Sequence, residues 1–250
     1  MSKFARGYTK DTADPNDYGL EEHPTLLTVG LPRLPSVVDL RSLMSPIRDQ
    51  GQLGACTAFA WCALMESLLL QTHQPLTMFS PLELYYEERA MEGDIVEDAG
   101  AQLRTGAKVL KAQGVCPEMD DPYDITQFTT APTPAALADA ASHRITAYYR
   151  VSTLRQLKRT LAWGHPTVIG VDVYESFEAD STIATGNVPM PEPGEQLLGG
   201  HAICACGYDD ATQTVLIHNS WSDQVGDKGY FRLPYGFWSA GITTDMWTAV

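Results

Sequence analysis

The segment Asp49–Ala60, with the sequence DQGQLGACTAFA, contains the first chemically informative residue of this 250-residue chain. Two glycines precede Cys56, and from Cys56 to Leu70 the residues are apolar almost all round, which predicts a buried helix. Cys56 is therefore expected in the first turn of a helix, where the helix dipole and unpaired N–H groups favour thiolate over thiol. A cysteine in such a position is also common as a small core residue, so this segment alone leaves both interpretations open.

Two later segments contain the other groups that a nucleophilic thiol requires. The sequence GGHAI at Gly199–Ile203 places His201 at the start of a strand, and IHNSW at Ile217–Trp221 ends another strand with Asn219 followed by an indole. A thiol nucleophile needs a base to take its proton, and the base needs a third group to fix the orientation of its ring. Cys56, His201 and Asn219 would supply these three groups.

The overall pattern of the chain predicts an arm followed by helices and then strands. Residues 1–33 hold three glycines and three prolines without a helical period, and we expect an extended arm. Helices are predicted from Cys56, from Pro81 with Ser80 as N-cap, and over residues 101–112 and 153–163. Strands are predicted at residues 167–173, 202–208, 215–218 and 229–233, and a long surface loop at 175–200. This order favours an α+β fold with two lobes, a mainly helical one at about 34–145 and a mainly β one at about 146–250.

Composition excludes several classes of function. The chain has 17 basic and 31 acidic residues, a net charge of −14, which argues against a nucleic-acid partner or an anionic membrane surface. No apolar run approaches the length of a membrane span. The first residues contain no apolar stretch after their basic residues, so no secretory signal is predicted. The five cysteines fit neither a disulfide framework nor a zinc site. We therefore expect a cytoplasmic, reducing environment, no metal and no cofactor.

With these motifs in this order, the sequence resembles the papain-like cysteine peptidases, the cathepsin family, over roughly residues 34–250. The match includes Pro46–Phe59, the histidine strand, and the Asn-Ser-Trp run followed by GDKGYFR. The resemblance implies a helical lobe and a barrel-like β lobe with the active-site cleft between them. It departs from the family at Leu53, where a disulfide-bonded Cys is usual, and at Thr57, where Trp is common.

The resemblance also implies roles for individual residues. Cys56 would be the nucleophile, His201 its base and later the acid, and Asn219 the residue that orients the imidazole. Gln50 would offer its side-chain N–H to the oxyanion together with the backbone N–H of Cys56. Trp221 would cover the hydrogen bond between Asn219 and His201.

Further residues are implied to contact the substrate. The backbone at Gly100 and Ala101 would pair with an extended peptide, and the pocket beside it would take the side chain two residues before the scissile bond. Asp245, in a stretch that resembles the one carrying an acidic residue in cathepsin B, would lie at the floor of this pocket and pair with a substrate arginine; the alternative is a solvated carboxylate. The implied substrate-binding residues are Gly100, Ala101, Leu103, Gly170, Gly199, Gly200, Ala202, Trp221 and Asp245.

The leading functional prediction is a cysteine endopeptidase that hydrolyses peptide bonds of a peptide or protein substrate through a thioester acyl-enzyme. Two alternatives stay open: an acyltransferase or transglutaminase that uses the same triad, and a non-catalytic binding protein with the same fold. The arm of residues 1–33 is too short for an independently folded prodomain. It either reaches the cleft and regulates access, or is a tethered tail without a gating role.

Overall fold

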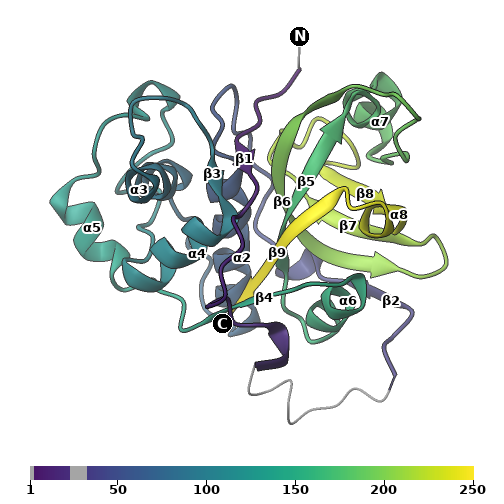
Figure 1. Ribbon diagram of the computed structural model, residues 1–250. Coiled ribbons are helices and arrows are strands. Elements are labelled where there is room, and N and C mark those ends of the chain that lie inside the picture. The colour runs from purple at the N-terminus through teal and green to yellow at the C-terminus, as the bar shows by residue number, and fades with distance from the viewer. Residues whose placement is uncertain (1–2, 23–32) are drawn as a thin grey trace.

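A computed structural model of the protein, shown in Figure 1, describes residues 3–22 and 33–250. On one side of the molecule four helices pack together. They are α2 (Cys56–Gln71), α3 (Pro81–Glu92), α4 (Leu103–Ala112) and α5 (Pro134–Ala140). Helix α2 is buried along its first three turns, because its residues from Cys56 to Ser67 are nearly all small or apolar and contact neighbours on every side. The predicted buried helix is therefore confirmed.

The other side of the molecule is built on one seven-stranded antiparallel sheet. Its strand order is β4-β9-β5-β6-β7-β8, and β2 (Val37–Asp39) also pairs with β6. The remaining strands are β4 (Tyr148–Arg150), β5 (Thr167–Tyr174), β6 (Leu197–Asp209), β7 (Thr214–His218), β8 (Tyr230–Pro234) and β9 (Thr243–Ala249). The expected α+β, papain-like arrangement of a helical and a strand-rich side is confirmed. The β lobe is not a closed barrel, however, since β4 and β8 end the described sheet without pairing with each other.

Strand β6 separates two hydrophobic cores because successive side chains of a strand point to opposite faces. Ala202, Cys204 and Cys206 belong to the core shared with α2, whereas Ile203 and Ala205 belong to the core on the far face of the sheet. Figure 1 shows α2 beside β6 at the centre of the molecule. All five cysteines are buried and free, so the structure has no disulfide, including the one that is usual in the family at the position of Leu53.

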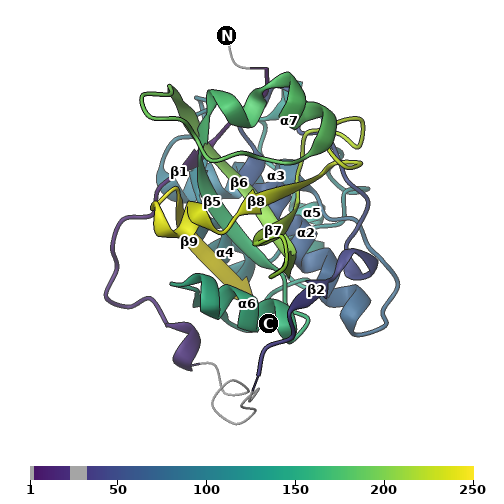
Figure 2. The ribbon, with the colours of Figure 1, turned by 90° about the vertical axis from the view of Figure 1, so that its right-hand side faces the viewer.

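Short elements complete the fold. In the second view, Figure 2, α6 (Leu154–Ala162) lies near the lower edge of the sheet and α7 (Asp180–Thr185) near its upper edge. The other short elements are η1 (Leu20–Glu22), η2 (Arg41–Leu43), η3 (Ile125–Gln127), η4 (Glu175–Glu178) and α8 (Gly236–Ser239). Among the described residues no helix is long and apolar enough to cross a bilayer. Nor do His, Cys, Asp and Glu side chains there form a group of three or more that could hold a metal ion.

Two sequence predictions need correction. The stretch 175–200 is not a featureless surface loop, because it contains η4, α7 and the first residues of β6. Helix α7 ends at Gly186, which adopts the left-handed conformation with φ of 72° that terminates many helices. The helix predicted over residues 101–112 begins two residues later, since Ala101–Gln102 forms strand β3, which pairs in parallel with strand β1 (Tyr8–Thr9) of the N-terminal arm.

Candidate active site

Cys56 opens α2 with its sulfur enclosed. The residue is 0% exposed, and its Sγ accepts hydrogen bonds from the backbone N–H of Ala202 and of Gly7, each at 3.4 Å. Burial raises the pKa of the Cys56 thiol to about 11, although these two N–H groups act in the opposite direction. The expected thiolate is therefore not favoured in this state: loss of solvent around the sulfur outweighs the helix N-terminus.

His201 and Asn219 are joined by a hydrogen bond of 2.8 Å between His201 Nε2 and Asn219 Oδ1. Since the amide oxygen can only accept, Nε2 carries the proton and the lone pair lies on Nδ1. This Nδ1 is buried and has no hydrogen-bond partner among residues 3–22 and 33–250. Burial lowers the pKa of His201 to about 4, which keeps the imidazole neutral. His201 is thus oriented as a proton acceptor.

Trp221 covers this pair. Its ring stacks on the His201 ring with centroids 4.6 Å apart, and Trp221 is 2% exposed with the arm in place. Phe4 of the arm also stacks on the indole, with centroids 4.3 Å apart and an angle of 6° between the ring planes. The hydrogen bond between His201 and Asn219 is therefore shielded from water by aromatic rings, as the sequence resemblance implied for Trp221.

Gln50 is held in one orientation by Ser220. The Ser220 hydroxyl donates to Gln50 Oε1 at 2.6 Å, so Gln50 Nε2 points the other way and donates to Leu53 O at 3.0 Å and to Ala5 O at 3.3 Å. The backbone N–H of Gln50 also donates to Ser220 O at 2.9 Å, which fastens the loop before α2 to the segment after β7. Sequence reasoning missed Ser220, whose signal was a hydroxyl directly after Asn219.

The N-terminal arm crosses this site at Gly7. The N–H of Ala101 donates to Gly7 O at 2.7 Å, and Tyr8 is in register with Ala101. Space at the crossing is small: a Cβ on Gly7 would lie 1.7 Å from Gly54 O, and a Cβ on Gly100 would lie 1.9 Å from Gly7 O. Figure 1 shows β1 passing between the helices and the sheet. The backbone at Gly100 and Ala101, expected to pair with a substrate, pairs here with the arm.

Tyr8 fills a pocket next to this crossing. A Cβ on Gly170 would lie 2.2 Å from Tyr8 Cζ, and one on Gly200 would lie 2.4 Å from Tyr8 O, so both glycines leave room for the arm. The Tyr8 hydroxyl hydrogen-bonds to Thr244 Oγ1 at 2.6 Å and donates to the carboxylate of Asp245. Asp245 is 3% exposed, so it is a buried pocket-floor residue and not a solvated carboxylate.

The other residues implied to bind substrate take different positions. Gly199 faces Arg6, whose Nε would lie 3.5 Å from an added Cβ. Ala202 contacts Cys56, since its N–H donates to Cys56 Sγ. Leu103 is 0% exposed and belongs to the same hydrophobic core as Tyr8.

Ion pairs fix the arm on both sides of Gly7. Before it, Arg6 pairs with Glu178 at 2.7 Å, and both side chains are nearly buried. After it, Lys10 pairs with Asp172 at 2.9 Å, and Asp17 pairs with Arg104 at 2.8 Å. Exposed pairs contribute little, but the buried ones would leave an unpaired charge if broken. The described part of the arm is therefore anchored at several points along the cleft.

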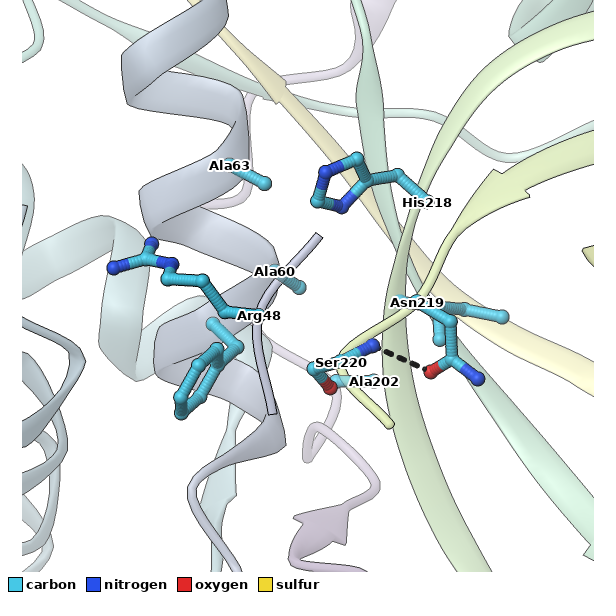
Figure 3. Close-up of a pocket in the computed structure, with 9 residues that line it drawn as sticks. Arg48, Ala60, Ala63, Ala202, His218, Asn219 and Ser220 are labelled. Atoms are coloured by element: carbon cyan, nitrogen blue, oxygen red, sulfur yellow. Dashed lines mark hydrogen bonds between the residues drawn. The ribbon is translucent and has the colours of Figure 1, made fainter. Parts of the chain in front are cut away.

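Figure 3 shows a small cavity behind the site, between α2 and the segment His218–Ser220. Its volume is about 10 Å³, about the minimum that holds one water molecule. The dashed bond in Figure 3 joins Ser220 N to Asn219 Oδ1 at 2.8 Å, while His218 points away from Asn219 and bonds Ser45 O. This cavity is too small for a peptide, and the space in front of Cys56 is taken by the arm.

Comparison with known proteins identifies the family to which this chain belongs. The family described as papain family cysteine protease matches residues 34–250. The chain belongs to the papain family of cysteine peptidases. It is 37% identical over 229 residues to an uncharacterized peptidase C1-like protein of Acanthamoeba polyphaga mimivirus, covering 87% of this chain and 73% of that one. This cysteine peptidase is thus a hydrolase.

Two further relatives extend the comparison. The crystal structure of xylellain, a cysteine protease from Xylella fastidiosa, is 34% identical with a TM-score of 0.87, and the match covers 98% of this chain and 95% of xylellain. Coverage of that extent includes most of the arm before Leu34. The viral cathepsin of Spodoptera litura multicapsid nucleopolyhedrovirus is 28% identical over 218 residues. That match covers 86% of this peptidase but only 61% of the viral cathepsin, less than two thirds of its length.

The docked arm predicts an unusual pH dependence for Cys56. In the docked state burial raises the pKa of the Cys56 thiol to about 11. Docking of the arm is therefore fully stabilised at a pH below the pKa of the exposed thiol, and it weakens as the pH rises towards 11. Alkylation of Cys56 by iodoacetamide, followed by peptide mapping, is expected to titrate at a lower pH in the Gly7→Ala variant than in the parent. Superimposable profiles would show that the arm does not control the thiol.

Proposed function

We propose that this cysteine peptidase is an endopeptidase that uses Cys56, His201 and Asn219 as its catalytic triad. The observation that supports it best is the convergence of three separate segments. The sulfur of Cys56 accepts the N–H of Ala202, the residue next to His201, and the ring of His201 is bonded to Asn219.

The reaction follows from these atoms once the arm has left. Nδ1 of His201 takes the proton of the Cys56 thiol, and the sulfur attacks the carbonyl carbon of the scissile peptide bond. The oxyanion accepts hydrogen bonds from Gln50 Nε2 and the backbone N–H of Cys56. His201 then gives its proton to the leaving amine as the C–N bond breaks, leaving a thioester. Water, deprotonated by His201, hydrolyses the thioester and restores the thiol.

We also propose that the N-terminal arm inhibits the enzyme while it is docked. The arm places the N–H of Gly7 against the sulfur at 3.4 Å, and the amide of Gln50 donates to Ala5 O at 3.3 Å. The arm thus occupies both the proposed nucleophile and the proposed oxyanion donor, so a substrate cannot reach them while the arm is docked. Burial under the arm also keeps the thiol and the imidazole neutral, so the nucleophilic ion pair does not form.

Substitutions in the triad and its neighbours test the catalytic roles. In the Gly7→Ala background, Cys56→Ala is expected to abolish hydrolysis of a fluorogenic peptide, and His201→Ala nearly so, because the two residues act as a unit. Asn219→Ala should retain more activity, since it orients the base and transfers no proton. Gln50→Ala should lower kcat by about 10²–10³, the cost of one oxyanion donor.

Assays with water alone and with an added amine acceptor distinguish the peptidase from an acyltransferase and from a non-catalytic protein. An acyltransferase would form the same thioester but give product only when an amine acceptor is added, and a non-catalytic protein would give none with either acceptor. Unfolding midpoints of all variants serve as the control for structure. A folded Asn219→Ala variant as inactive as Cys56→Ala would contradict the orienting role.

Gly7→Ala tests inhibition by the arm without changing the enzyme's own site. The added Cβ would lie 1.7 Å from Gly54 O, a backbone collision that the arm can relieve only by moving. Overpacking of this kind costs about 1–3 kcal/mol, so we expect kcat/KM for a peptide substrate to rise by about tenfold or more. Thr9→Ala, at an exposed position of the same strand, is the matched control and should leave activity unchanged. Equal activity of both variants and the parent would remove the gating role.

A further inference from the structure

The second half of the described arm is acidic and lies against a basic surface of the enzyme. Residues 11–22 contain five acidic side chains and no basic one. Helix α4 carries Arg104, Lys108 and Lys111, which share one side of the helix because they are spaced four and three residues apart. Figure 1 shows the arm running from β1 past α4 and β4 to η1. We call these three residues, together with Arg150 of β4, the basic face.

Asp11 of the arm is held by groups that suit a carboxylate. Its side chain is 0% exposed, and its oxygens accept hydrogen bonds from the backbone N–H of Arg104 at 3.1 Å and from Trp247 Nε1 at 2.8 Å. The Arg150 guanidinium lies 3.6 Å from the oxygen that Trp247 contacts. Two neutral donors and one cation of the enzyme therefore surround this carboxylate.

Two further aspartates of the arm follow along the basic face. Asp17 pairs with Arg104 at 2.8 Å and with Arg150 at 3.3 Å, and its side chain is only 11% exposed. Asp14 lies 3.9 Å from Lys108, in a pair that is more exposed and therefore weaker. The three carboxylates thus recur at every third residue of the arm, and the contacts of each with the basic face differ.

The arm also pairs with an edge of the sheet. Strand β4 is the first strand in the described order of the sheet, and the N–H of Arg150 donates to Tyr18 O at 2.8 Å. Gly19 forms a parallel bridge with the same residue. A strand edge pairs with an extended peptide through backbone hydrogen bonds that do not depend on its sequence. The edge therefore contributes affinity, and the basic face contributes selection for acidic side chains.

The charge of the basic face is opposite to that of the whole molecule. The chain has a net charge of −14, so its overall field repels an acidic peptide. When the arm leaves, its three aspartates leave with it. The four cations of the basic face then face the carboxylate of Asp245, which pairs with Arg150 at 2.6 Å. The site that the arm vacates is therefore complementary to a peptide with the charge pattern of the arm.

We propose that the basic face and the edge of β4 form a binding site for an acidic, extended segment of a partner protein, distinct from the residues of the proposed triad. The arm is the intramolecular occupant of this site. A partner segment with carboxylates at every third residue competes with it and removes the anchors of residues 11–19, which favours release of Gly7 from Cys56. This release rests on the proposed inhibition by the arm, whereas binding of the partner does not.

Peptide binding tests the site without turnover. The acceptor is the full-length protein with Asp11→Asn, Asp14→Asn and Asp17→Asn, which weaken its own arm. A fluorescein-labelled peptide with the sequence of residues 9–22 is titrated by fluorescence anisotropy, and saturable binding is expected. The same three Asn substitutions in the peptide should weaken binding by about tenfold or more, because hydrogen bonds to charged groups are lost. Equal binding of the two peptides, or no saturable binding, would overturn the proposal.

Charge reversal on the enzyme provides a matched pair of variants. Lys108→Glu changes an exposed side chain of the basic face and should weaken binding of the acidic peptide by about threefold or more. Lys228→Glu changes an exposed lysine just before β8, the strand at the opposite end of the sheet from β4, and should leave binding unchanged. Equal weakening by both would contradict a localised site. Full displacement of the peptide by inorganic phosphate at the same concentration would contradict recognition of a peptide.

The reactivity of Cys56 tests competition with the arm. An excess of the acidic peptide should accelerate alkylation of Cys56 by iodoacetamide in the full-length parent, and the peptide with three Asn substitutions should not. Lys108→Glu should also accelerate alkylation, because it weakens the arm, while Lys228→Glu should have no effect. Peptide binding without faster alkylation would support the binding site and refute inhibition by the arm.

Discussion

The close approach of the Gly7 backbone to Cys56 is the contact on which the state of this enzyme depends. The N–H of Gly7 reaches the sulfur at 3.4 Å only because neither Gly7, Gly54 nor Gly100 carries a side chain at the crossing. Glycine serves here for close backbone approach rather than for flexibility. Cys56 and His201 are both buried, and burial moves their two pKa values apart in the direction that leaves both groups neutral.

In the proposed mechanism the N-terminal arm and a substrate compete for the same site. The arm offers aromatic contacts at Phe4 and Tyr8, a backbone pairing at Ala101, and ion pairs at its two ends. A substrate can reproduce the backbone pairing and the pocket contact, but it adds a carbonyl carbon in front of the sulfur where the arm places an N–H. Because the arm is tethered, its effective concentration is high, which favours the docked state over a free peptide that makes the same contacts.

The sequence predicted the main helices and strands and singled out the residues now proposed as catalytic, because both depend on short local patterns. Cys56, His201 and Asn219 each stand in a distinctive run of residues, and α2 and β6 show their burial through apolar periodicity. The state of the thiol could not be predicted, since the helix N-terminus favours thiolate, and the burial that raises the pKa of the thiol depends on tertiary packing. Likewise Asp245, expected at the floor of a pocket, is buried, but its partner Arg150 lies 95 residues away and has no sequence signal.

Hydrogen–deuterium exchange of the full-length protein tests most directly whether the arm and a substrate-like ligand compete for the site around Cys56. Exchange at residues 3–22 is measured by mass spectrometry in the free protein and after Cys56 has been modified by a thiol-directed epoxide peptide mimic. The account predicts that the amides of Gly7 and its neighbours are protected in the free protein and exchange rapidly once the cleft is filled. Fast exchange of this segment in both states, or equal protection in both, would contradict it.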